Sequence, residues 1–100
     1  PPYTVKGALL ILQNSKTPLM IDLLEWQEPT DNRPPYPNLY HLGIARVALS
    51  TNDLDSDVAF LKSEGVEFLS DPATVKIENQ PETRFVCFKD PDGTILELVE

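Results

Sequence analysis

The sequence predicts an α+β fold, with a β-hairpin over residues 5–26 and a β-α-β-β-β unit over residues 44–100. Three observations lead to this prediction. Residues 44–50 and 94–100 alternate along the chain as half-buried strands do. An acidic helix start follows the first of these strands. The segment DPDG at 90–93 has the residues of a tight turn, directly before the last strand.

The first part of the chain predicts two strands. Residues 5–13 are rich in Leu, Ile and Val, and residues 14–18 form a turn cluster. Residues 19–26 read as a second strand, with helix as the rival interpretation. This segment is short and lies between Pro18 and Pro29, which favours the strand. Together they predict a hairpin with a loop of roughly five residues.

A proline-rich linker is predicted over residues 27–43. Proline fixes φ and lacks an N–H, so this stretch forms neither a helix nor a central strand. The linker separates residues 1–26 from the unit over 44–100. Either a linker or an ordered surface loop fits this composition.

The second unit begins with a strand over 44–50 and a helix over 53–64. Asn52 or Asp53 is the expected N-cap, with further acidic residues in the first turn, and Gly65 is expected just past the helix end. Strands are then predicted over 66–69, 83–89 and 94–100, with a weaker candidate at 74–78. The predicted core is Val47, Leu49, Leu54, Val58, Leu61, Phe68, Val86, Leu96 and Leu98.

The composition narrows the class of partner. The net charge of -8 disfavours binding to nucleic acid or to an anionic membrane. The longest apolar run, GALLILQ, is far shorter than the roughly 18 residues that a membrane span needs. We also expect no signal peptide. The single cysteine, Cys87, fits a reducing compartment, so a cytoplasmic location is expected.

Two segments resemble a known family. The run GIARVALSTNDLDSDVAFLKSEG over 43–65 is similar to the opening strand and helix of a vicinal oxygen chelate module. FKDPDGTILELVE over 88–100 resembles the final hairpin of that module. The superfamily includes glyoxalase I, extradiol dioxygenases and bleomycin-resistance proteins. MIDLLE at 20–25 is similar to ILELVE at 95–100, which implies that residues 1–26 hold the last strands of an incomplete first module.

The resemblance also implies a site. In the resembled family two modules cup a divalent metal such as Zn, Ni, Fe or Mn, which a His from the first strand and a Glu from the last strand of each module bind. Carried over, Glu97 is the catalytic and metal-binding carboxylate of the second module, and Asp22 is its shorter equivalent in the first. The usual His position holds Arg46, and arginine does not bind metals.

Three interpretations of Arg46 stay open. It pairs bidentately with Glu97 in place of a metal, or it holds the carboxylate or phosphate of a bound small molecule. In the third, a metal remains on Glu97 and Asp22 with an unexpected further ligand. The first is favoured, so no cofactor is expected and a divalent metal is kept as the alternative. Trp26 and Ser50 are further candidates for substrate binding.

Two other reactive side chains have plainer interpretations. His41 is the only histidine, and a surface or packing role is favoured over metal binding. Cys87 lies in an apolar strand, where a buried inert thiol is favoured over a nucleophile.

Three functions are therefore compatible with the sequence. The chain is a metal-free binder of a small molecule, or a metal-dependent lyase, isomerase or dioxygenase as part of a longer chain, or a non-catalytic interaction module. Because a lone hairpin is marginally stable, residues 5–26 are expected to pack beside the 44–100 sheet, within the chain or in a partner. A homodimer, or a second module of a longer chain, is the expected assembly.

Overall fold

The structure is a computed structural model that describes residues 2–14, 16–17 and 19–100. The chain divides into two compact units, Pro1–Arg33 and Pro34–Glu100, and each is described by itself. Among the helices that the structure describes, none is long and apolar enough to cross a membrane.

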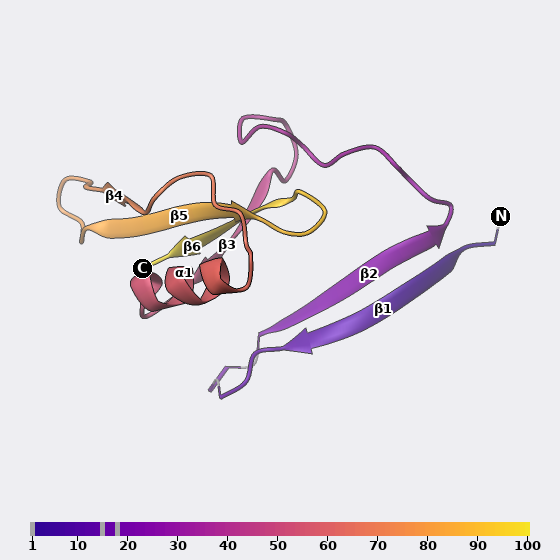
Figure 1. The fold of residues 1–100 in the computed structure, drawn as a ribbon, viewed down its shortest axis with the longest axis horizontal. Coiled ribbons are helices and arrows are strands. Elements are labelled where there is room, and N and C mark those ends of the chain that lie inside the picture. The colour runs from indigo at the N-terminus through magenta and orange to yellow at the C-terminus, as the bar shows by residue number, and fades with distance from the viewer. Residues whose placement is uncertain (1, 15, 18) are drawn as a thin grey trace. The chain divides into compact units, whose positions relative to one another are not determined.

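The first unit is an antiparallel hairpin of β1 (Thr4–Ile11) and β2 (Met20–Glu28) (Figure 1). This confirms the predicted hairpin, but β2 extends two residues into the segment predicted as linker. The amide of Leu12 donates to the carbonyl oxygen of Leu19 at 2.9 Å and so closes the loop. The predicted turn at 14–18 includes Ser15 and Pro18, which lie outside the described residues.

Every described residue of β1 and β2 is exposed. Strand alternation places Leu10, Ile21 and Leu23 on one face of the hairpin and Leu9 and Leu24 on the other. The hairpin therefore shows apolar side chains on both faces. Whether it packs beside the 44–100 sheet stays a prediction.

The second unit has one helix, α1 (Leu54–Ser63), and a four-stranded sheet in the order β3-β6-β5-β4. The strands are β3 (Arg46–Ser50), β4 (Ala73–Val75), β5 (Thr83–Lys89) and β6 (Ile95–Val99). β3 runs parallel to β6, and the other neighbours are antiparallel. The unit has the predicted order β-α-β-β-β, although the strand after the helix is formed by a different segment than predicted (Figure 1).

One predicted strand is wrong. Residues 66–69 make a single bridge, from Phe68 to Phe88, and the strand after the helix is β4, which overlaps the weaker candidate at 74–78 in two residues. The chain first meets the end of β5, where the amide of Lys89 donates to the carbonyl oxygen of Glu67 at 3.1 Å and the amide of Leu69 to that of Cys87 at 2.9 Å. It then bends over residues 69–71, before Pro72, which has no N–H to donate, and pairs again further along the same edge.

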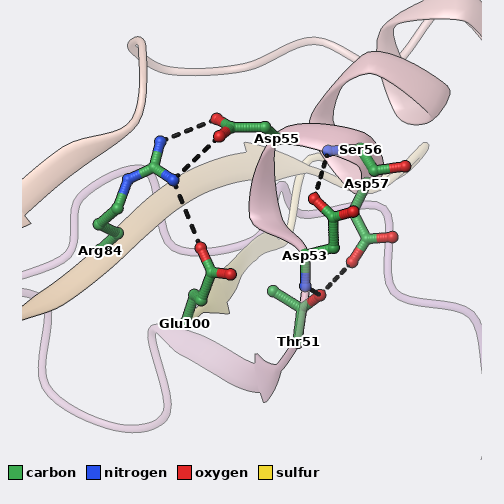
Figure 2. A network of polar contacts seen from close by, with 7 residues as sticks. All are labelled: Thr51, Asp53, Asp55, Ser56, Asp57, Arg84 and Glu100. Carbon is green, nitrogen blue, oxygen red and sulfur yellow. Dashed lines mark hydrogen bonds and ion pairs between the residues drawn. The ribbon is translucent and has the colours of Figure 1, made fainter.

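The start and end of α1 confirm the predicted signals. The Asp53 carboxylate accepts a hydrogen bond from the amide of Ser56 at 3.1 Å, which makes Asp53 the N-cap. The Thr51 hydroxyl contacts the Asp57 carboxylate in the first turn (Figure 2). At the other end Gly65 adopts a φ of 86°, a conformation that disfavours residues with a Cβ.

The core lies between α1 and one face of the sheet. Leu54 is fully buried, with an exposed fraction of 0%. Val47 was predicted to be core, but it is 46% exposed because β3 is an edge strand with a neighbour on one side only. The other predicted core residues are buried or half-buried together with Phe88: Leu49, Leu54, Val58, Leu61, Phe68, Val86, Leu96 and Leu98.

Ion pairs of Arg84 with Asp55 and Glu100 connect the first turn of α1 to the sheet (Figure 2). Arg84 of β5 donates to both carboxylate oxygens of Asp55, at 2.8 and 3.1 Å, and to Glu100 at 3.4 Å. The hydrogen bonds from Arg84 hold the pKa of the Asp55 carboxyl below its usual range. This cluster is exposed, so we assign it a structural role.

Candidate functional site

The candidate site is the sheet face opposite the helix. Residues paired across neighbouring strands project to the same side, so the register groups Ala48, Glu97 and Cys87. Arg46 and Ser50 lie two positions from Ala48 along β3 and share that side. Arg46 and Glu97 therefore lie on the same face of the sheet.

Arg46 and Glu97 form an ion pair on this face. The Nη1 atom of Arg46 donates to Oε2 of Glu97 at 2.7 Å. The contact uses one nitrogen and one oxygen, so the bidentate geometry predicted from the sequence is wrong. The Glu97 side chain is 10% exposed and that of Arg46 is 46% exposed. The pair thus joins a nearly buried anion to a half-exposed cation.

Cys87 completes the local polar contacts. Its thiol donates weakly to the same Oε2 atom of Glu97 at 3.5 Å. Burial raises the pKa of the Cys87 thiol, and the hydrogen bond to Glu97 and the charge of that carboxylate raise it further. A raised pKa keeps sulfur protonated at neutral pH, which agrees with the predicted inert thiol.

An open hollow of about 250 Å³ adjoins the ion pair. Arg46 and Glu97 form its polar end. Its remaining lining is mostly apolar and comes from Val75, Ile77, Thr83, Phe85 and Val99. An apolar surface with a few convergent polar groups is the usual form of a small-molecule site.

The other predicted site residues lie elsewhere. Ser50 is exposed at the far end of β3 and does not line the hollow. Trp26 and Asp22 belong to β2 of the first unit, where the Trp26 ring meets that of Tyr3 edge-on at 5.9 Å. Their participation in a site with Glu97 stays a prediction.

His41 has a packing contact of its own. Its ring stacks on Tyr36 with the centroids 4.1 Å apart, and its Nδ1 atom lies 2.7 Å from the carbonyl oxygen of Leu42. These contacts agree with the packing role expected for His41.

The donor set at Glu97 does not suit a divalent cation. One carboxylate oxygen already accepts from a guanidinium, which would repel a metal ion at that position. In the part of the chain that the structure describes, no group of three or more His, Cys, Asp or Glu side chains is placed to bind a metal.

Sequence reasoning missed part of the site. Thr83, Phe85 and Val99 were assigned to predicted strands but not to the site. The alternation of β5 carries the signal, because it places Thr83, Phe85 and Cys87 on the side opposite Val86. Ile77 falls in the weaker candidate strand at 74–78, but it follows β4 outside any strand, so strand alternation does not place it at the hollow.

Comparison with known proteins defines the class. The sequence model of the Glyoxalase/Bleomycin resistance protein/Dioxygenase superfamily matches residues 12–98. The uncharacterized protein YaeR of Escherichia coli (strain K12) is 35% identical over 81 residues, which cover 81% of this chain and 57% of YaeR.

Solved structures show the same fold. A glyoxalase family protein from Bacillus cereus matches with a TM-score of 0.74 at 23% identity, over 98% of this chain and 62% of that protein. One from Enterococcus faecalis matches with a TM-score of 0.57 at 24% identity, over 98% of this chain and 78% of that protein. At these identities the likeness is one of fold.

The chain belongs to the Glyoxalase/Bleomycin resistance protein/Dioxygenase superfamily. Its α+β fold is of the vicinal oxygen chelate type, as the resemblance implied. The chain spans 57% of YaeR and 62% of the Bacillus cereus protein.

Proposed function

We propose that this chain binds a small molecule on the sheet face opposite α1, here called the open face, beside Arg46 and Glu97 and without a divalent metal. The observation that carries the proposal is the hollow next to the ion pair. The apolar lining supplies burial for the body of a ligand, and the half-exposed guanidinium supplies an oriented donor. A cation already accompanies Glu97, so the carboxylate does not need a metal to balance its charge.

The test is a fragment screen monitored by NMR on the isotope-labelled chain. We expect bound fragments to shift the amide resonances of residues 46, 83–85 and 97–99. Arg46→Met should abolish these shifts. Arg84→Met is the matched control, because it removes an arginine from the opposite face of the same sheet. A screen in which no fragment shifts these resonances would refute the proposal.

Metal analysis tests the metal-free part separately. The alternative is a metal-dependent lyase, isomerase or dioxygenase, in which Glu97 and Asp22 would bind Zn, Ni, Fe or Mn. About one equivalent of such a metal in protein purified without added metal, lost in Glu97→Ala, would decide for that alternative.

We further propose that the hairpin is covered by a second copy of the chain. Its two faces carry exposed apolar side chains, and an isolated two-stranded hairpin is only marginally stable in water. Leu23→Lys places a charge on one apolar face, whereas Glu25→Lys, on the same face, changes a position that is already polar. Light scattering at micromolar concentration should give a dimer for the parent and Glu25→Lys, and dissociation for Leu23→Lys. A monomeric parent would contradict this assembly.

A further inference from the structure

The polar end of the hollow combines one anion with one cation, and this decides which ligands it accepts. We infer that the hollow selects neutral or zwitterionic molecules that carry a hydrogen-bond donor beside an acceptor on a short apolar body, in preference to simple anions. The inference rests on the proposed function, since it names the class of ligand for the same site.

The ion pair leaves hydrogen-bonding groups free on both partners. In the described residues, Oε2 of Glu97 accepts from Arg46 and Cys87, whereas Oε1 accepts from no protein group. No fully buried side-chain oxygen or nitrogen lacks a partner in this part of the chain, so Oε1 keeps some exposure at the surface of the hollow. Arg46 donates to Glu97 through Nη1 alone, and its other N–H groups stay available.

A ligand that meets this pair therefore finds an acceptor next to donors. A carboxylate or carbonyl oxygen matches the remaining N–H groups of Arg46, and an ammonium or amide N–H matches Oε1 of Glu97. An α-amino acid presents both groups on neighbouring atoms. A plain carboxylate satisfies Arg46 only and places a negative charge beside the Glu97 carboxylate.

The wider charge distribution points the same way. The pair sums to zero, and the chain as a whole carries a net charge of -8. Lys89 lies on the same side of β5 but lines a separate depression together with four acidic residues, namely Glu64, Glu67, Asp90 and Asp92. No excess of positive charge among the lining residues offsets the repulsion of an anion by Glu97.

The apolar end sets the size of the ligand. Val75, Ile77, Phe85 and Val99 supply aliphatic and aromatic surface. The volume of about 250 Å³ lies below the roughly 300–1,000 Å³ of sites for drug-sized molecules. The body of the ligand should therefore be about the size of one branched aliphatic side chain.

Three small molecules with the same branched body separate the contributions of the two charges. Leucine carries both groups, 4-methylpentanoate carries the carboxylate alone, and 3-methylbutylamine carries the ammonium alone. We expect NMR titration of the full chain to show leucine binding roughly ten-fold more tightly than either relative, because each relative forfeits one charge-assisted hydrogen bond.

A variant tests the charge argument directly. Glu97→Gln retains an acceptor oxygen and removes the negative charge, so 4-methylpentanoate should become the tighter ligand. Glu100→Gln is the matched control, since Glu100 pairs with Arg84 outside the hollow, and it should keep the parental order. Thermal unfolding of both variants confirms that they are folded. A structural role for Glu97 alone would weaken all three ligands without reversing their order.

The outcomes separate this inference from the proposed function. If 4-methylpentanoate binds the parent as tightly as leucine, the ligand class is overturned while binding at the hollow stands. If none of the three molecules shifts the amide resonances of the residues that line the hollow, the ligand class is again overturned. The proposed function falls only if the fragment screen is also empty at these residues.

Discussion

We predict that removing Arg46 and removing Glu97 lower the free energy of unfolding by different amounts. Glu97 is nearly buried, with a side chain 10% exposed, whereas the Arg46 side chain is 46% exposed. Arg46→Met leaves the carboxylate with a thiol as its only hydrogen-bond donor among the described residues. We expect it to cost about 1.5–3 kcal/mol, the loss of a hydrogen bond to a charged group. This is less than the roughly 3–5 kcal/mol for breaking a fully buried pair.

Glu97→Gln should cost less than Arg46→Met. It retains an acceptor for Arg46, and the half-exposed guanidinium remains hydrated, so we expect about 0.5–1 kcal/mol. The double variant Arg46→Met/Glu97→Met replaces both charges by apolar side chains, and it should return to within about 1 kcal/mol of the parent.

Urea unfolding measures these three free energies, with the dependence on urea checked for a constant slope. For a unit of this size, 1 kcal/mol corresponds to a shift in melting temperature of about 4–8 °C. Glu97→Gln costing more than Arg46→Met would refute the burial argument. A double variant as unstable as the sum of two single losses would show that the two side chains are not coupled.

Three further predictions concern the helix side and the thiol. Leu54→Ala should cost about 2–5 kcal/mol in urea unfolding because Leu54 is fully buried, whereas Phe60→Ala, at a position 62% exposed on the same helix, should cost under about 1 kcal/mol. The pairing with Arg84 lowers the pKa of Asp55, so this pairing stabilises the fold above pH 3.8, and the stabilisation is lost as the pH falls through the lowered pKa. The difference in urea midpoint between the parent and Asp55→Asn should therefore shrink on acidification. Cys87 should react slowly with iodoacetamide at pH 8 in the folded chain and quickly in urea, since burial raises the pKa of its thiol; equal rates would contradict that assignment.

Local signals predicted the second unit well. The N-cap at Asp53, the glycine at 65 and the turn at 90–93 each act within a few residues, so the sequence alone indicates them. The failures involve longer distances. The segment after the helix pairs with β5 in two short pieces separated by the bend at residues 69–71, and Val47 is exposed because β3 is at the edge of the sheet. Neither strand order nor edge position is contained in a local pattern.

The site divides in the same way. Alternation in β3 was enough to place Arg46 on the face of Ala48, and the register of β3 against β6 adds Glu97 to that face. The one-point geometry of their contact was not predictable, because it depends on side-chain rotamers. The contact of Cys87 with Glu97 depends on the register of β5 against β6, which the turn at 90–93 sets.

The carboxylate of Glu97 determines what the open face can do. A nearly buried anion requires a compensating charge, and a metal ion or a guanidinium can supply it. A metal with open coordination positions would add a Lewis acid, whereas Arg46 adds only directed hydrogen bonds and a permanent charge. With Arg46 as the partner, this face can orient a ligand through directed hydrogen bonds. The raised pKa of Cys87 keeps its thiol protonated, so it is not available as a thiolate nucleophile. These features support the proposal that this face binds a small molecule, with the charge of Glu97 selecting among ligands.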